Sequence, residues 1–386
     1  MYSLRASIDG QPSPSHAVPV GATRYSSPVH ANESTIQVLD LFAGAGGLTQ
    51  GLHESSARYR IAGAVEMDRA AAETYKQVFG DVMHQGRIED WLETHAVPEV
   101  DLVVGGPPCQ GFSALGRQDA DDARNQMWRH YAKTVALAAP KYFVLENVPQ
   151  FLKSPEFQIF CKITETGGEL ADYVLTPHTL NAADYGAPQA RKRVVVIGRH
   201  RDMEDPGEPQ KTHVDAHVTV GEALRGIKAH VTEQLLPEGR FVELEDGKML
   251  PGEFKTTELH LTRNFEQLSL DRFASIPIGG NRFDLPDELK APCWRRHTTG
   301  SGDVMGRLHS DRPSVTIRTE FFKPEKGRYL HPTENRAITH FEAARLQGFP
   351  DDYKWVGSKT AIAKQIGNAV PIKLASAIGT LLSRHL

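Results

Sequence analysis

The feature that most constrains this 386-residue chain is a regular alternation of apolar runs and helical patterns between Ser34 and Arg199. Runs of four or five mostly apolar residues predict buried strands, and the segments between them carry apolar or small residues at helical spacing. We expect strands at Ile36–Asp40, Ile61–Val65, Asp101–Val104, Tyr142–Leu145 and Arg193–Ile197, and helices from about Gly47, at Arg69–Phe79, at Trp128–Ala139 and at Phe157–Thr166. Strands that alternate with helices predict an α/β fold with a doubly wound, mostly parallel sheet.

The periodicity fades after about His200, where proline, glycine, glutamate and histidine become more frequent. Helical patterns return at His340–Gln347 and after Ile372, and this last stretch should pack onto the sheet because a short isolated helix is only marginally stable. The sequence therefore predicts a flexible tail over residues 1–33, a first domain over 34–199 plus 340–386, and a second, smaller, irregular β-rich domain over 200–339.

The composition excludes several classes of protein. No run of about 18 apolar residues is present, which argues against a spanning helix, and the N-terminal stretch lacks the basic and apolar pattern of a secretory signal. The three cysteines, Cys109, Cys161 and Cys293, are odd in number and far apart, which argues against a disulfide framework and for a reducing compartment. No cysteine or histidine spacing is typical of a structural metal site.

The charges are unevenly distributed. The formal net charge is −4, but residues 291–331 hold eight lysines and arginines against four acids, whereas residues 231–258 hold three against seven. A locally basic segment in a mildly acidic protein fits a face that binds a polyanion. An ordinary solvated surface explains the same counts equally well.

A glycine-rich turn, Asp40–Leu48, ends the first expected strand. Gly44, Gly46 and Gly47 would let a ligand approach the backbone closely, and the following helix would offer free N–H groups. A dinucleotide site would carry a third glycine where Thr49 stands, so a smaller nucleoside fits better. Glu66 closes the second strand, 19 residues after Gly47, where an acid can accept hydrogen bonds from ribose hydroxyls. Tight packing alone is the alternative explanation of the turn.

A second turn, Gly105–Ser113, follows the third strand at the edge where open α/β sheets bind their ligands. Its Cys109 is presented by two prolines and is a candidate nucleophile. Glu146 follows the fourth strand and should reach the same edge, where partial burial would let it donate a proton near neutral pH. A surface acid that caps the next helix is the alternative for Glu146.

Two arginines precede the last strand. Arg191 and Arg193 alternate with Lys192, so their side chains should leave the strand on one face. Two guanidinium groups aimed at one spot suit a carbonyl or phosphate oxygen. Ordinary surface arginines at a strand start are the alternative.

Taken together, these blocks resemble the C5-cytosine DNA methyltransferases of bacterial type. The blocks occur in family order and cover the chain from about Ile36 to its end, except for about His200 to Gly300. The matching residues are Asp40–Leu48, Val65–Asp68, Gly106–Ser113, Asp121–Asn125, Glu146–Val148, Gln189–Arg193, Arg312–Thr316, Glu342–Pro350 and Gln365–Pro371.

The resemblance implies a Rossmann-like enzyme that uses S-adenosylmethionine and flips a cytosine out of double-stranded DNA. By the resemblance, Cys109 would add to C6 of the base and Glu146 would hold and protonate its N3 edge. Arg193 would contact O2, and Arg191 would support the flipped nucleotide or its phosphate. Residues 34–199 plus 340–386 would be the catalytic domain that binds the cofactor, and residues 200–339 would form the target-recognition domain and hinge.

The resemblance also implies a cofactor pocket, with two departures from the family. Arg87 stands where the family often carries an acid near the adenine amine, so Asp90 or Glu89, or backbone groups, would replace it. Met67 stands where an aromatic residue is sometimes found. Pro108 would present its carbonyl near the cytosine amine at the edge of this pocket. The expected pocket residues are Phe42, Gly44, Gly46, Gly47, Glu66, Met67, Asp90, Pro108 and Asn368.

The expected DNA contacts fall in two places. Ser113 and Arg117 lie in the loop after the nucleophile, which in the family closes over the flipped base. Arg295 and Arg296 form the expected reading element of the unmatched region, with phosphate contact as the alternative. Asn264, Arg282 and Trp294 are weaker candidates.

Two rival functions remain open at this point. A tRNA cytosine methyltransferase shares the scaffold, but Ser113 and about a hundred unmatched residues favour DNA. A catalytically silent DNA-binding protein would be expected to lack the nucleophile, the acid or the arginines, all of which are present. We therefore expect a monomeric, cytoplasmic, nucleoid-associated modification enzyme of a restriction-modification system, whose cognate endonuclease acts separately.

Overall fold

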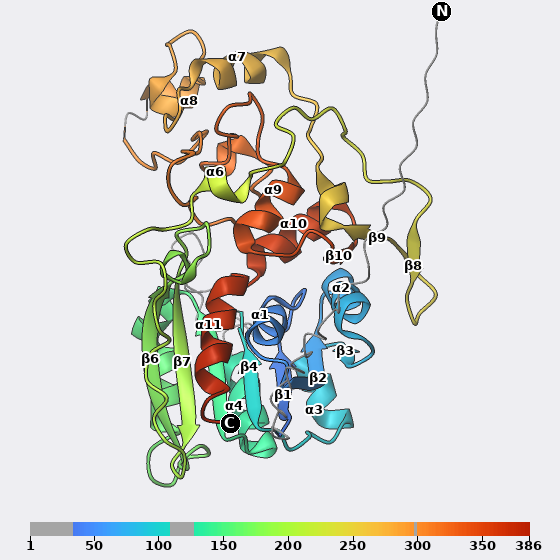
Figure 1. Ribbon diagram of the computed structural model, residues 1–386, viewed down its shortest axis with the longest axis vertical. Helices are drawn as coiled ribbons and strands as arrows, with labels where there is room; N and C mark the ends of the chain where they lie inside the picture. The colour runs from blue at the N-terminus through green and yellow to red at the C-terminus, as the bar shows by residue number, and fades with distance from the viewer. Residues whose placement is uncertain (1–33, 109–126, 297–298) are drawn as a thin grey trace, which may run out of the picture. The chain divides into compact units, whose positions relative to one another are not determined.

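The computed structural model describes residues 34–108, 127–296 and 299–386 (Figure 1). A seven-stranded sheet occupies the lower half of the view in Figure 1, with strand order β3-β2-β1-β4-β5-β7-β6. Its strands are β1 (Ile36–Leu41), β2 (Tyr59–Glu66), β3 (Met83–Gln85), β4 (Leu102–Gly105), β5 (Tyr142–Asn147), β6 (Tyr173–Asn181) and β7 (Lys192–His200). The first five strands are mutually parallel, and β7 runs antiparallel to both β5 and β6.

The expected α/β fold with a mostly parallel sheet is confirmed, and two strands were not foreseen. β3 has only three residues, too few to produce a clear sequence pattern. β6 contains Pro177 and many half-buried or exposed residues, as an edge strand can, so it does not form a continuous apolar run. The direction of β7 was also not predicted, because an apolar run carries no information on strand direction.

Helices cover both faces of the sheet. Neighbouring side chains of β1 point to opposite faces, so they belong to two different hydrophobic cores. Ile36 and Val38 belong to the core that α1 (Gly47–Ser55) and α11 (Ile372–Leu382) complete. Leu39 and Leu41 belong to the core on the other face. That second core is closed by α3 (Ile88–Thr94), α4 (Met127–Ala138) and α5 (Pro155–Lys162), while α2 (Arg69–Phe79) flanks the β2 and β3 side.

The last helix packs against the sheet, as the sequence predicts. Helices α1 and α11 lie against each other at small residues: a Cβ atom on Gly51 would lie 2.3 Å from the Cβ of Ala375, and one on Gly379 would lie 2.3 Å from the Oγ of Ser55. The close approach of the two helices therefore requires glycine at position 51, where backbone atoms also lie within 2.7 Å, whereas a side chain at position 379 would first displace the hydroxyl of Ser55.

The region after His200 contains short elements and long irregular stretches. A small antiparallel sheet has the order β10-β9-β8, so strand β10, which belongs to the C-terminal part of the chain, completes a sheet begun within residues 200–339. The regular elements here are α6 (Val220–Ala223), β8 (Phe241–Glu243), β9 (Met249–Lys255), α7 (Gln267–Ser275), α8 (Pro292–Arg296), α9 (His340–Gln347), β10 (Lys354–Val356) and α10 (Lys359–Asn368).

Short 3₁₀ helices connect the larger elements. They are η2 (Pro149–Lys153), η3 (Ala182–Tyr185), η4 (Thr256–Leu259), η5 (Arg282–Asp284) and η6 (Pro324–Lys326). In the part of the chain that the structure describes, no helix combines the length and apolar character needed to cross a membrane.

The contact between α1 and α11 leads to a stability prediction. Alanine favours a helix over glycine by about 1 kcal/mol, yet Gly51→Ala should lower the free energy of unfolding by about 1–3 kcal/mol because its methyl group overpacks the interface. Urea unfolding measures the change. Gly302→Ala is the matched control, because a Cβ there would make only an ordinary contact at 3.6 Å. Unchanged or increased stability of Gly51→Ala would show that the helices do not meet as described.

Candidate active site

Most of the described residues that the sequence predicts for catalysis and cofactor binding lie along one edge of the main sheet. This edge is formed by the carboxyl ends of the parallel strands β1, β2, β4 and β5. Because β7 is antiparallel to β5, its first residues reach the same edge, with Val194 paired to Asn147. Residues from both strand directions therefore meet where an open α/β sheet binds its ligands.

The glycine-rich turn after β1 has one open position and two packed ones. Gly44 has φ +56°, and a Cβ there would meet no atom of the described residues within 4 Å. A Cβ on Gly46 would collide with the ring of Phe79, and one on Gly47 would lie 2.9 Å from the carbonyl oxygen of Val370. Packing therefore explains Gly46 and Gly47, whereas none of the described residues crowds Gly44, so a ligand can approach its backbone. Phe42 also has a positive φ of 55°, which is uncommon for a non-glycine residue.

Glu66 joins the ends of β1 and β2. Its Oε2 accepts a hydrogen bond from the Gly44 N–H at 2.9 Å, and its Oε1 accepts one from the Asp68 N–H at 2.7 Å. Burial raises the pKa of Glu66, although the two N–H groups oppose that shift. Each carboxylate oxygen has a second lone pair. Glu66 can therefore hold the turn and still accept a hydrogen bond from a ligand hydroxyl.

Asp40 is a fully buried acid beneath this turn, and sequence reasoning gave it no role. Its Oδ2 accepts a hydrogen bond from the Thr49 hydroxyl at 2.7 Å, and Thr49 lies 2.8 Å from the Tyr75 hydroxyl. Its Oδ1 has no hydrogen-bond partner among the described residues. Burial raises the pKa of Asp40 to about 7; the Thr49 hydrogen bond lowers it and the charge of Glu66 raises it further.

The other expected cofactor residues lie around the same edge. Met67 follows β2 and is 66% exposed, so its thioether is free to pack on a flat group. Asp90 is exposed in the first turn of α3. Pro108 is half-buried beyond β4, and Asn368 is exposed at the end of α10. The open position at Gly44, the carboxylate of Glu66 and the exposed Met67 fit a nucleoside.

The turn after β4 is held by Asn147, another residue that sequence reasoning gave no role. The Asn147 side chain donates from Nδ2 to the Pro107 carbonyl at 3.1 Å and accepts from the Val148 N–H at 2.8 Å. A Cβ on Gly106 would lie 3.1 Å from Oε2 of Glu146, so glycine leaves room for that carboxylate. The turn that precedes Cys109 is thereby fixed against the end of β5.

Glu146 and Arg193 form an ion pair at this edge. Arg193 Nε lies 2.8 Å from Glu146 Oε1, so the contact is an ion pair, and its N–H does not point at the oxygen as in a hydrogen bond. Both side chains are largely buried, at 13% and 11% exposure. A carboxylate and a guanidinium therefore sit side by side next to the turn, where they can bind the polar edge of a flat heterocycle. Glu146 does not cap a following helix, as the alternative interpretation required: the N-cap of η2 is Val148, which makes no side-chain capping bond, and α5 is capped by Ser154.

Arg191 is directed elsewhere. Its Nη1 donates to the carbonyl oxygens of Ile317 at 2.9 Å and Gly367 at 3.1 Å, and only 3% of the residue is exposed. Burial lowers its pKa to about 9, and Arg193 acts in the same direction. The sequence predicted that both guanidinium groups point at one spot, but the structure directs Arg191 to backbone carbonyl groups and only Arg193 to Glu146. Arg191 lies before β7 and fastens the second region to the end of α10.

Two glutamines complete this fastening, and both were missed as structural residues. Gln189 donates from Nε2 to Oε1 of Gln347 at 2.7 Å and accepts from the Ile317 N–H at 2.7 Å. Gln347 in turn donates to the carbonyl oxygen of Ile366 at 2.5 Å. Both are fully buried, so their hydrogen bonds have no competition from water. Residues from sequence blocks that lie far apart in the chain thus form one polar network. The sequence signal for this network was the presence of a glutamine, Gln189 or Gln347, within two of the blocks that match the family.

The expected DNA-contacting residues lie away from this edge or outside the description. Arg295 and Arg296 are exposed in the last turn of α8, and Trp294 of the same helix is half-buried. Asn264 is exposed before α7. Cys109, Ser113 and Arg117 lie outside the described residues.

Asp40 gives the site a testable pH dependence. Its pKa is about 7 in the folded protein against 3.8 in the unfolded chain, so the folded state binds this proton more tightly. The resulting stabilisation is complete below about pH 4 and is lost as the pH rises towards 7. Asp40→Asn cannot ionise, so its free energy of unfolding relative to wild type should rise by roughly 1.4 kcal/mol per pH unit across this window. Urea unfolding at several pH values measures the difference, and a constant difference would contradict the assignment.

Comparisons with known proteins identify the family of the chain. The family model described as C-5 cytosine-specific DNA methylase matches residues 36–384. The type II methyltransferase M1.HphI of Haemophilus parahaemolyticus is 36% identical, covering 89% of this chain and 86% of the relative. The type II methyltransferase M.XorII of Xanthomonas oryzae pv. oryzae is 31% identical, covering 90% and 84%.

Solved structures share the fold. A prophage-encoded protein of E. coli superposes with a TM-score of 0.68 at 24% identity, covering 91% of this chain and 99% of the other. The Dnmt2 methyltransferase of S. pombe gives a TM-score of 0.53 at 18% identity, covering 90% and 99%. Because the family model matches residues 36–384 of the 386-residue chain, the protein belongs to the C-5 cytosine-specific DNA methylase family.

Proposed function

We propose that this protein methylates C5 of a flipped-out cytosine in a specific sequence of double-stranded DNA, with S-adenosylmethionine as methyl donor. The observation that carries the proposal is the Glu146–Arg193 ion pair beside the turn that leads into Cys109. At this edge the chain offers an acid and a guanidinium for the polar edge of a pyrimidine, and in the sequence Cys109 follows the turn directly. The names of the most similar relatives, all type II methyltransferases, support a role as the modification enzyme of a restriction-modification system.

The chemistry explains why these residue types are needed. Cytosine C5 is a poor nucleophile, and the base must leave the helix before its ring can be reached. Addition of the Cys109 thiolate to C6 makes an enamine, whose C5 can accept a methyl group. Glu146 holds and protonates N3, which stabilises the adduct, and Arg193 contacts O2. Loss of the C5 proton to water then lets the thiolate leave from C6 and restores the aromatic ring.

The cofactor site lies on the β1–β2 side of the same edge. S-adenosylmethionine would supply an electrophilic methyl group when bound. Glu66 would accept hydrogen bonds from the ribose hydroxyls, and Phe42 and Met67 would pack on the adenine. Gly44 would line the methionine end, Asp90 would lie near the adenine amine, and Asn368 would close the pocket. Gly46 and Gly47 would act by shaping the turn, since packing accounts for the absence of their side chains.

The work is divided between two parts of the chain. In this proposal, residues 34–199 plus 340–386 bind the cofactor and carry the reaction, and residues 200–339 recognise the target. Arg191 joins the two through the carbonyl oxygens of Ile317 and Gly367. It would therefore support the flipped nucleotide by positioning the segment around Ile317. We propose that the protein works in the cytoplasm as a monomer, without lasting contact with an endonuclease.

The alternative on the same scaffold is methylation of cytosine in tRNA. The solved structures with this fold include a Dnmt2 protein, but their identity to this chain is below 25% and they indicate the fold alone. Relatives at 30% identity or above include the type II methyltransferases M1.HphI, M.XorII and M.NgoFVII. This difference favours DNA over tRNA as the substrate.

The central prediction concerns the nucleophile. Cys109→Ala should abolish methyl transfer, because no other group on the turn can add to C6, yet it should keep the DNA affinity of the wild type. Incorporation of tritiated methyl groups into mixed-sequence duplex DNA measures activity, and fluorescence anisotropy measures binding. Cys161→Ala is the control, because Cys161 lies in α5 away from the sheet edge. Full activity of Cys109→Ala would exclude the proposed reaction.

A second readout traps the adduct itself. Fluorine at C5 blocks the final elimination, so wild-type protein should form an SDS-resistant complex with DNA that contains 5-fluorocytosine when S-adenosylmethionine is present. Cys109→Ala should form none. Bisulfite sequencing of DNA from a host that expresses the chain then identifies the methylated base and its sequence context. Methylation of tRNA without methylation of DNA would support the alternative.

A further prediction tests the cofactor assignment. Glu66→Gln loses the charge that strengthens hydrogen bonds to a ribose, so it should weaken S-adenosylmethionine binding by about tenfold or more while leaving DNA binding unchanged. Isothermal titration calorimetry measures the dissociation constant. Glu54→Gln removes an acid that is paired with Lys373 outside the proposed pocket and serves as the matched control. Equal cofactor affinity of the two variants would refute the role of Glu66.

A further inference from the structure

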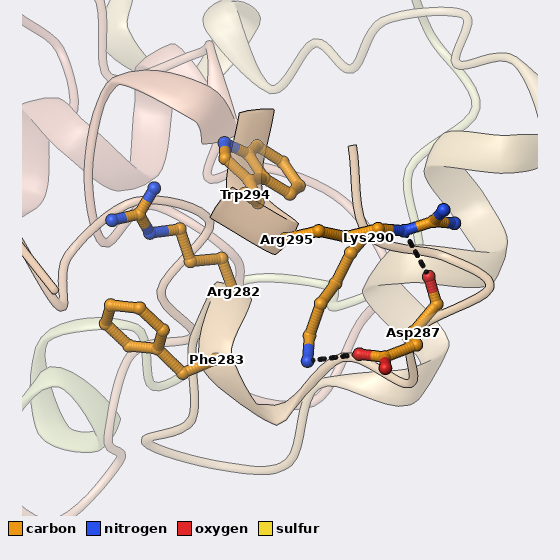
Figure 2. Close-up of a pocket in the computed structure, with 6 residues that line it drawn as sticks. All are labelled: Arg282, Phe283, Asp287, Lys290, Trp294 and Arg295. Carbon is orange, nitrogen blue, oxygen red and sulfur yellow. Dashed lines mark hydrogen bonds and ion pairs between the residues drawn. The ribbon is translucent and has the colours of Figure 1, made fainter. Parts of the chain in front are cut away.

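The cations around the hollow between η5 and α8 diverge. This hollow of about 310 Å³ is lined by Arg282, Phe283, Asp287, Lys290, Trp294 and Arg295. Figure 2 shows the head groups of its two arginines and its lysine pointing in different directions, and Lys290 is held by Asp287 at 2.7 Å. Polar groups converge instead on the glycine-rich turn after β1, and one of them comes from a distant part of the chain.

The turn after β1 is held by hydrogen bonds to its backbone from two segments. The Gly44 N–H donates to Oε2 of Glu66 at 2.9 Å, and Glu66 belongs to the adjacent strand β2. The carbonyl oxygen of Ala45 accepts a hydrogen bond from the hydroxyl of Tyr353, which lies 308 positions later in the chain. Tyr353 immediately precedes β10, which packs beside α2 (Figure 1). A neighbouring strand and a distant segment therefore hold the same turn.

The bond to Ala45 matters because the turn has little else to fix its backbone. Gly44 and Gly46 have φ angles of +56° and +86°, and glycine changes its backbone conformation at little cost. Gly46 is also the N-cap of α1 and has no side chain with which to cap that helix. The carbonyl group of Ala45 lies between the two glycines. Holding it fixes the peptide plane between Ala45 and Gly46 and limits the directions that the Gly44 backbone can take.

Tyr353 is itself rigidly placed. Only 4% of the residue is exposed, and its ring centre lies 4.8 Å from that of Phe349 and 5.1 Å from that of Trp355. Its carbonyl oxygen accepts a hydrogen bond from the N–H of Thr256, in η4, at 2.9 Å. Burial raises the pKa of Tyr353 well above its usual value, and the charge of Asp40 acts in the same direction, so the hydroxyl keeps its proton and donates it. The region after His200 thus supports the turn through Tyr353.

We propose that Tyr353 positions the cofactor turn: its hydroxyl holds the Ala45 carbonyl group and thereby keeps the Gly44 backbone in the conformation that receives the methionine end of S-adenosylmethionine. The proposal rests on the proposed function, which requires the cofactor to bind at this turn. Gly46 fits this role, because a Cβ there would lie only 3.1 Å from Oη of Tyr353 and would obstruct the hydroxyl. Tyr353 acts through Ala45 and is therefore a positioning residue.

Tyr353→Phe tests the proposal, because it removes the hydroxyl and keeps the packed ring. Loss of one hydrogen bond to the turn should weaken S-adenosylmethionine binding to the protein alone by about three- to tenfold, as measured by isothermal titration calorimetry. In steady-state methylation of duplex DNA, the KM for S-adenosylmethionine should rise by a similar factor, and kcat should fall by less. The DNA affinity in fluorescence anisotropy should stay at the wild-type value.

Tyr59→Phe is the matched control. Tyr59 is fully buried, and its hydroxyl also donates to a backbone carbonyl group, that of Gly379 at 2.7 Å. It begins β2, however, and so lies at the opposite edge of the sheet. Each variant loses one buried hydrogen bond, so both should unfold at a lower urea concentration than the wild type. Tyr59→Phe should nevertheless keep the wild-type dissociation constant for S-adenosylmethionine.

Two outcomes would overturn the role of Tyr353. A wild-type dissociation constant for Tyr353→Phe would leave it as a purely structural residue, and an equal loss of cofactor affinity in both variants would trace the loss to lowered stability. If the wild type itself binds no S-adenosylmethionine, the cofactor assignment of the proposed function fails and the role of Tyr353 falls with it. The titration of the wild type therefore distinguishes the two kinds of failure.

Discussion

The arrangement of this active site depends on the reversal of one strand. Strand β7 pairs antiparallel with β5, so a chain segment that would otherwise begin at the far edge of the sheet begins beside the end of β5. Arg193 is the second residue of β7 and Glu146 is the last but one of β5. The backbone ladder alone therefore brings a guanidinium to within 2.8 Å of a carboxylate that lies 47 positions earlier in the chain. Neither group needs a dedicated loop to reach the other.

The same reversal places Arg191 where it can join the two parts of the chain. Because β7 starts at the active edge, the residues just before it lie between the sheet and the later segments. Arg191 and Gln189 use that position to bind the backbone of Ile317, and Gln347 extends the network to α10. Buried polar groups of this kind are costly unless every partner is in place. The network thus ties the geometry at Glu146 to the packing of the second region.

Strand and helix positions within the sheet could be predicted because each is a local pattern. The bounds of α2 and α9 agree with the periodicity, and β1, β2, β4 and β5 coincide with apolar runs. Strand direction, the short β3 and the edge strand β6 depend on pairing partners, which no local pattern records. The pocket residues around Glu66 could be proposed from the spacing of the glycines and the acid in the sequence. The different roles of Gly44 and Gly46 could not, because the ring that crowds Gly46 belongs to Phe79 in another element.

The buried acid beneath the glycine turn shows how such non-local effects enter the chemistry. Asp40 belongs to a matched sequence block, yet its significance lies in its surroundings: Thr49 satisfies one oxygen, and the other is left without a partner among the described residues. Glu66 raises the pKa of Asp40 by its charge and also holds the backbone of Gly44. Any ligand that changes the environment of Glu66 must therefore alter the proton affinity of Asp40, and by reciprocity the protonation of Asp40 must alter the binding of that ligand. The glycine turn is thus coupled through electrostatics to the core beneath it, as well as through its backbone geometry.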